Sequence, residues 1–236
     1  ERISVADAFT RHAGIDLLAT IAADGRTDRN ALLKQVQAAG MRAADDDTWA
    51  DLFSRVIVEK VEPNLGNGRV TILDRYPVAE AALARPCADD PRVAERFEVY
   101  ACGVELANAF GELTDPAEQR RRFDAEMAEK QRVYGETYPL DEDFLEALEE
   151  MPEASGIALG FDRLVMLATG ALRIDQVIWA PVAATEAIFS LPSSSARLAS
   201  ASWLLAAPAM IGARRASRVC GLTMAPRAQG AKTSTS

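Results

Sequence analysis

The sequence predicts an α+β domain over residues 1–182, followed by a tail of different composition at 183–236. Two observations support this fold class. Apolar and polar residues alternate with the period of a strand in two stretches, 69–76 and 96–112. Other segments open on a helix-capping residue, carry apolar residues at helical spacing, and several stop at a glycine. Helices and paired strands are therefore expected within one chain segment.

The first three expected helices are placed by their caps and their apolar periodicity. Ser4 opens the first helix and Gly14 closes it, whereas Thr27 caps a second helix over 28–39. The third helix has a stripe of apolar residues, which is more typical of a core than of a ligand site: Trp49, Leu52, Phe53 and Val56.

The middle of the chain then alternates between strand and helix signals. A Gly-Asn-Gly turn at 66–68 leads into the strand at 69–76, which Pro77 ends. After the second strand-like stretch, Asp115 and a following proline start a long charged helix that runs to about residue 134. A short helix at 144–151, capped by Asp141, precedes the last ordered stretch.

The stretch 96–112 predicts a β-hairpin with its turn at Cys102 and Gly103. A two-residue turn places Glu98 and Glu105 on the same face of the hairpin. Two carboxylates on one face repel each other unless a cation lies between them, and Mg²⁺ that carries substrate phosphates satisfies such a pair. A solvated hairpin face is the alternative interpretation of the same residues.

Three further side chains follow on the second strand of this hairpin. Asn108, Phe110 and Glu112 repeat at two-residue spacing but are out of phase with Glu105. All of them can face one pocket only if a β-bulge lies near Ala107, and bulges are common beside active sites.

Residues 155–167, Ser-Gly-Ile-Ala-Leu-Gly-Phe-Asp-Arg-Leu-Val-Met-Leu, form a small-residue strand that runs into an apolar helix, with Arg163 at the junction. Their pattern Gly-x-Ala-Leu-Gly-x-Asp-Arg-Leu resembles the third signature motif of class II aminoacyl-tRNA synthetases. In the hairpin, Glu-Arg-Phe-Glu and Glu-Leu-Ala-Asn-x-Phe-x-Glu-Leu resemble the lysyl branch. Within that branch the sequence is most similar to the short paralogues that ligate (R)-β-lysine to a lysine of elongation factor P.

The resemblance covers residues 1 to about 182 and implies a partial catalytic domain, an antiparallel sheet flanked by helices. Counterparts of the first two class II motifs are not found in this sequence. The resemblance implies ATP and Mg²⁺ as cofactors. It implies Glu98, Glu105 and Arg163 as catalytic and ATP-binding residues, with the two glutamates also as ligands of the metal. Gly156 and Gly160 would allow ATP to approach the backbone.

The amino-acid substrate implied by the resemblance is lysine or (R)-β-lysine. Glu112 would receive the side-chain ammonium, and Ala158, where lysyl-tRNA synthetases carry glycine, would favour an amino group on the β-carbon. The expected substrate-binding residues are Asn108, Phe110, Glu112, Tyr100 and Ala158.

Three functions remain open from the sequence. The first is an AMP-forming ligase that modifies elongation factor P, the second is a lysyl-tRNA synthetase fragment with tRNA as acceptor, and the third is a truncated, catalytically silent paralogue. The net charge of −9, from 35 acidic and 26 basic residues, argues against sequence-independent binding of nucleic acid. It therefore favours the ligase that modifies elongation factor P. The family implies a homodimer.

The composition changes after residue 182. Residues 183–236 are rich in alanine and serine and carry a charge of +5, against −14 for the rest of the chain. This tail is expected to be disordered, with a basic interaction arm as the alternative. The whole sequence has no apolar run of 18 residues and no signal-peptide pattern, so a cytoplasmic protein without a membrane partner is expected.

Overall fold

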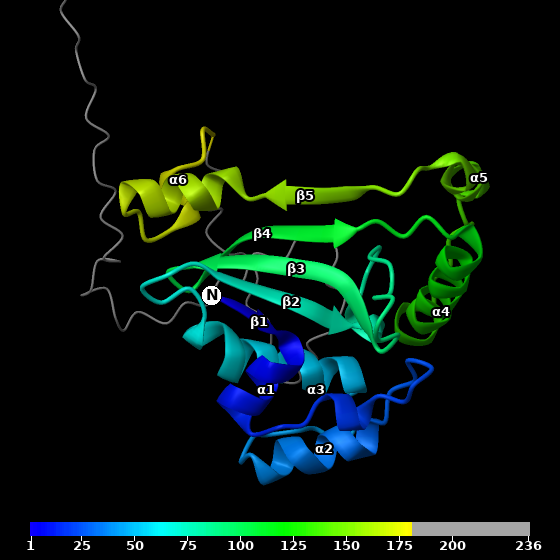
Figure 1. Ribbon diagram of the computed structural model, residues 1–236, viewed down its shortest axis with the longest axis horizontal. Helices are drawn as coiled ribbons and strands as arrows, with labels where there is room; N and C mark the ends of the chain where they lie inside the picture. Colours follow the sequence, from blue (N-terminus) through cyan, green and yellow to red (C-terminus); the bar gives the residue numbers. More distant parts are fainter. Residues whose placement is uncertain (181–236) are drawn as a thin grey trace, which may run out of the picture.

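The computed structural model describes residues 1–180 and is built on one five-stranded sheet with helices around it (Figure 1). The strands follow each other in chain order, and all neighbours are antiparallel except the first pair, which is parallel. They are β1 (Arg2–Ser4), β2 (Thr71–Pro77), β3 (Val93–Ala101), β4 (Val104–Gly111) and β5 (Ser155–Leu159). The predicted α+β class is confirmed, and the expectation for residues 183–236 lies outside the described residues.

Helices flank this sheet at one edge and at both ends of its strands. In Figure 1, α1 to α3 lie below the β1 edge, α4 and α5 lie at one end of the strands, and α6 lies at the opposite end, beside β5. The α-helices of the described region are α1 (Val5–Ala13), α2 (Arg29–Ala38), α3 (Trp49–Val56), α4 (Pro116–Tyr134), α5 (Glu142–Glu150) and α6 (Phe161–Thr169). None of them is long and apolar enough to cross a membrane.

The helix caps agree with the sequence in one case and differ in another. At α1 the Ser4 hydroxyl accepts a hydrogen bond from the Asp7 amide, and Gly14 closes the helix with a φ of 69°. At α2 the cap is Asp28 and not Thr27, because the Asp28 carboxylate accepts a hydrogen bond from the Ala31 amide. Thr27 pairs instead with Ile21 in an isolated β-bridge, so its extended backbone delays the helix by one residue.

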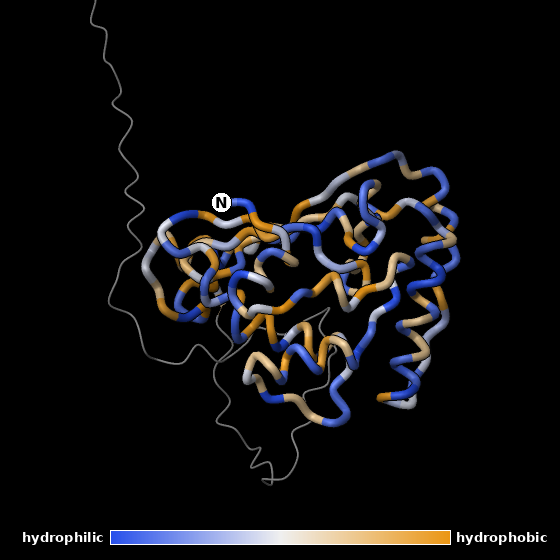
Figure 2. Tube along the Cα trace, turned by 60° about the horizontal axis from the view of Figure 1, so that its bottom comes forward, coloured by the Kyte–Doolittle hydropathy of each residue, from blue (hydrophilic) through white to orange (hydrophobic). Residues whose placement is uncertain are grey.

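The core lies between α1 to α3 and the sheet. The apolar stripe predicted for the third helix is confirmed, and the Phe53 ring stacks on Phe9 at 5.2 Å and on Trp49 at 5.4 Å. From the sheet, Leu73, Tyr76 and Tyr100 join this cluster, each less than 4% exposed. Figure 2 shows hydrophobic residues gathered in this part of the chain, whereas hydrophilic residues predominate along α4. The core therefore packs against strands β2 and β3.

Two short turns carry the chain from α3 into the sheet. A π-helical turn, η2 (Ile57–Val61), continues α3 and is followed by a 3-10 turn, η3 (Glu62–Asn64). Val61 and Leu65 are buried at the two ends of η3. The apolar anchors fix the position of Glu62 between them.

The hairpin of β3 and β4 closes at Cys102 and Gly103, as predicted. Both residues have positive φ values, 54° and 73°, which is the conformation that matches the right-handed twist of paired strands. Beyond β4, β5 pairs only with β4 among the described strands. Its Ile157 is 62% exposed and its Leu159 is 54% exposed, so β5 forms an open edge in this part of the chain.

Candidate functional site

A β-bulge in β4 organises the candidate site. Tyr100 lies opposite Glu105 and Val99 lies opposite Ala107, so Leu106 is an extra residue between them. An extra residue reverses the facing of every side chain that follows it along the strand. The bulge expected near Ala107 is thereby confirmed.

The bulge gathers the predicted residues on one face. Glu98 lies opposite Asn108 across β3 and β4, and Ala158 of β5 lies opposite Asn108 on the other side. Phe110 lies opposite Gly156 in the same way. Directly paired residues project from the same face of a sheet. This site face therefore holds Glu98, Glu105, Asn108, Phe110, Glu112, Gly156 and Ala158.

The Glu98 carboxylate is buried and held at both oxygens. Its Oε1 accepts a hydrogen bond of 2.7 Å from Arg96 Nη2, and its Oε2 accepts one of 2.7 Å from the Tyr100 hydroxyl. The Arg96 guanidinium lies over the Tyr76 ring, 4.3 Å from its centroid, and 5.8 Å from that of Phe110. Charge-assisted hydrogen bonds of this kind fix the orientation of a carboxylate.

Tyr100 occupies a different position from the one expected of a substrate-binding residue. Its side chain is only 2% exposed and belongs to the core. The hydroxyl contacts Glu98 and, at 3.3 Å, Oε1 of Glu62. Tyr100 pairs with Glu105 and therefore shares the site face with Glu98, but it lies at the buried end of this face, where it supports Glu98.

Arg163 is brought to Glu105 by the start of α6. The Gly160 amide donates a 2.8 Å hydrogen bond to the carbonyl of Leu106, the bulged residue. Arg163 Nη1 then donates to the Glu105 carbonyl at 3.0 Å and to its carboxylate Oε2 at 3.2 Å. Both side chains are about one-third exposed, so a phosphate can reach the guanidinium and a cation can reach the carboxylate.

Glu62 is a third carboxylate at this end of the site, and sequence reasoning did not find it. Burial, together with the neighbouring Glu98 carboxylate, raises the pKa of Glu62, and the same two causes raise the pKa of Glu105. Arg163 opposes the shift at both. Glu62 lies 38 residues before Tyr100 in a short 3-10 turn, and no periodicity or motif links the two. A cation would lower the repulsion among these carboxylates.

From Asn108 onward, β4 and the residues that follow it carry polar groups on the site face that suit an amino acid. Asn108 Oδ1 is buried and has no hydrogen-bond partner within residues 1–180. A buried acceptor of this kind is normally paired, so it marks a place for a donor group of a ligand. The Glu112 carboxylate lies against Gly156, because a Cβ built on Gly156 would come within 2.6 Å of Glu112 Oε1.

The oxygen ligands available fit a hard divalent cation. Glu98 and Glu105 offer carboxylate oxygens on one face, while within residues 1–180 no group of three or more His, Cys, Asp or Glu side chains forms a dedicated metal cage. Mg²⁺ is commonly bound by one or two carboxylates together with substrate phosphates and water. The residues present therefore match Mg²⁺ that arrives with a nucleotide.

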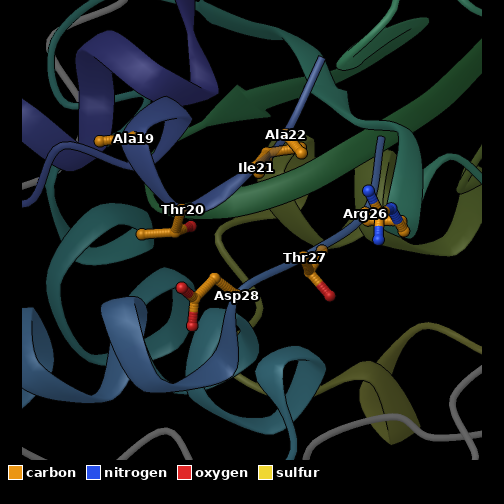
Figure 3. Close-up of a pocket in the computed structure, with 7 residues that line it drawn as sticks. All are labelled: Ala19, Thr20, Ile21, Ala22, Arg26, Thr27 and Asp28. Atoms are coloured by element: carbon orange, nitrogen blue, oxygen red, sulfur yellow. The ribbon is translucent and has the colours of Figure 1, made fainter. Parts of the chain in front are cut away.

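A cavity of about 350 Å³ lies elsewhere on the molecule (Figure 3). It is lined by residues 19–22 and 26–28, and none of them belongs to β3, β4 or β5. Its charged groups already have partners, since Arg26 is paired with Asp24 and Asp28 caps α2. The candidate site residues therefore lie outside this cavity.

Comparisons with known proteins point to one family. Residues 2–184 match the family model described as tRNA synthetases class II (D, K and N). Similar curated proteins include the elongation factor P (R)-β-lysine ligases of Sodalis glossinidius, 43% identical over 180 residues, and Proteus mirabilis, 44% identical over 184 residues. The Haemophilus influenzae protein of the same name is 39% identical over 179 residues.

These matches cover different shares of the two chains. They include 75%, 77% and 75% of this chain but only 54%, 55% and 53% of the three relatives, in the same order. The chain thus spans about half the length of the curated relatives it matches.

Proposed function

Because the chain belongs to the class II tRNA synthetase family of the D, K and N type, we propose that it carries part of an AMP-forming site that activates lysine or (R)-β-lysine and ligates it to elongation factor P. One observation carries this proposal. The bulge at Leu106 puts the Glu98 and Glu105 carboxylates and the Asn108 amide on the same sheet face, and these groups suit a metal with phosphates and an amino acid, respectively. Such proximity is what a reaction between a nucleotide and an amino acid requires.

Each residue has a role that follows from its place on this face. Glu98 and Glu105 hold Mg²⁺, which supplies positive charge against the crowded phosphates of ATP. Arg163 offers a planar guanidinium that can stack on adenine or pair with the terminal phosphate. The hydrogen bonds from Arg163 to Glu105 hold its guanidinium in place until the nucleotide binds.

Beside Glu98, Asn108 orients the substrate through its amide, and farther along the chain Glu112 pairs with the side-chain ammonium. The unpaired Asn108 Oδ1 supports this role. Gly156 leaves room for the Glu112 carboxylate, and Ala158 lies beside Asn108, where one methyl group can discriminate between α- and β-amino groups.

The acceptor assignment rests on different support. The similar proteins are named as ligases acting on elongation factor P, and the net charge of −9 disfavours tRNA. Incubation of the chain with ATP, radiolabelled (R)-β-lysine and either acceptor distinguishes the two. Label on elongation factor P supports the proposal, and label on tRNA alone replaces it with the synthetase alternative.

The nucleotide part of the proposal is tested by calorimetry with Mg²⁺ and ATP. Glu98→Gln and Glu105→Gln should each weaken Mg²⁺-dependent ATP binding more than tenfold, or above about 1.4 kcal/mol. Glu112→Gln is the matched control, because it removes a carboxylate from the same face at the amino-acid end and should leave ATP affinity unchanged. If the double variant Glu98→Gln, Glu105→Gln binds ATP as the parent does, the metal assignment is wrong.

A further inference from the structure

Tyr100 is the residue through which the core contacts the candidate metal site. Its ring is packed in the core cluster, while its hydroxyl reaches Glu98 Oε2 at 2.7 Å and Glu62 Oε1 at 3.3 Å. A phenol has one hydrogen to donate, and the shorter contact shows that Glu98 receives it. The Glu62 carboxylate contacts the same hydroxyl at the longer distance.

We propose that Tyr100 is a positioning residue for Mg²⁺–ATP. Its hydroxyl and Arg96 donate hydrogen bonds to the two oxygens of Glu98 and hold that carboxylate toward Glu105. The inference rests on the proposed role of Glu98 in nucleotide binding. We assign Tyr100 no contact with the nucleotide, since its side chain is only 2% exposed.

The hydrogen bonds from Tyr100 and Arg96 matter because they restrict the rotamers of the Glu98 side chain. An unrestrained Glu98 would have several rotamers, and ordering it on binding costs affinity. In this structure Arg96 fixes one oxygen and Tyr100 the other, each at 2.7 Å, so the remaining lone pairs keep a constant direction. Core packing fixes the Tyr100 ring, so its hydroxyl keeps a constant position relative to the Glu98 carboxylate.

The chain offers a closely matched control. Tyr76 is also a buried tyrosine on the same sheet and lies within the same cluster; its hydroxyl lies near Glu98 and Tyr100 but forms no hydrogen bond of good geometry in the described part of the chain. Tyr76→Phe therefore removes the same atom from the same environment and leaves both bonds to Glu98 intact. Tyr100→Phe removes the bond and keeps the ring, so both variants should fold, which urea unfolding checks.

The test combines crystal structures of the two variants with calorimetry of Mg²⁺–ATP and of lysine on the full chain. In Tyr100→Phe we expect Glu98 to leave its single conformation and the affinity for Mg²⁺–ATP to fall roughly tenfold, the size expected for losing a hydrogen bond to a charged group. Lysine affinity should stay unchanged. Tyr76→Phe should match the parent in all three measurements.

Two results would overturn the inference. One is a Tyr100→Phe structure in which Glu98 keeps its conformation. The other is a displaced Glu98 with undiminished Mg²⁺–ATP affinity, which would reduce Tyr100 to a core residue. If the parent chain binds no Mg²⁺–ATP, the proposed function fails and with it the nucleotide part of this inference, whereas the crystal structures still decide whether Tyr100 holds Glu98.

Discussion

Gly156→Ala changes one hydrogen for one methyl group at the contact between β5 and Glu112. The new Cβ would lie 2.6 Å from Glu112 Oε1, where ordinary contact begins at 3.4 Å. The carboxylate must therefore move by about 0.8 Å, because the alternative is to separate the backbone of β5 from β4. The substitution moves a proposed substrate ligand without removing it.

The expected size of the effect differs for binding and for folding. A charge-assisted hydrogen bond contributes about 1.5–3 kcal/mol, so displacing Glu112 should weaken lysine binding roughly tenfold or more. Folding should change by less than about 1 kcal/mol, because alanine lowers the entropy of the unfolded chain and offsets part of the strain. Gly156 does not need the left-handed backbone region, so alanine is tolerated there.

Calorimetry with lysine and with (R)-β-lysine measures the binding loss, and urea unfolding measures stability. Glu112→Gln and the double variant complete a double-mutant cycle. If the methyl group acts through Glu112, the double variant binds lysine no more weakly than Glu112→Gln alone. Unchanged affinity in Gly156→Ala, or strictly additive losses, would refute the placement of Glu112 at the substrate ammonium.

Three further predictions concern the acceptor, the substrate and pH. The chain should bind tRNA weakly at physiological salt because of its net charge of −9, and sub-micromolar binding retained at high salt would contradict this. Ala158 should favour (R)-β-lysine over lysine by roughly ten- to two-hundred-fold in pyrophosphate exchange, and Ala158→Gly should erase the preference; equal activation of both by the parent would exclude this role. Burial raises the pKa of Glu80 to about 7 from 4.5, with Arg96 opposing, so the folded state binds more protons than the unfolded state between these values. The free energy of unfolding should therefore fall by about 2–3 kcal/mol as pH rises through this window, and Glu80→Gln should flatten the curve in urea unfolding; an equal slope in both proteins would exclude Glu80 as the cause.

The hairpin shows how much of the site local sequence determines. Its alternation, its two-residue turn and the spacing of Glu98, Glu105 and Asn108 depend on neighbours in the chain, so they could be predicted together with the bulge. The stripe of α3 and the cap of α1 were predicted for the same reason, since both are set within one or two helical turns. Thr27 was misassigned as a cap because it pairs with Ile21 across a short turn, which keeps its backbone extended and moves the cap to Asp28.

The remaining features depend on contacts between distant segments. Glu62 joins the site only because the packing of α3 and η3 under the sheet carries it to Tyr100, 38 residues away in sequence. Burial of Tyr100 turns an expected substrate contact into a support for Glu98, and no periodicity records how deep a strand residue will lie. The composition and spacing of the chain thus determine which chemical groups this face carries, whereas packing determines which of them are exposed to a ligand, because burial and hydrogen bonding depend on neighbours that only the folded chain supplies.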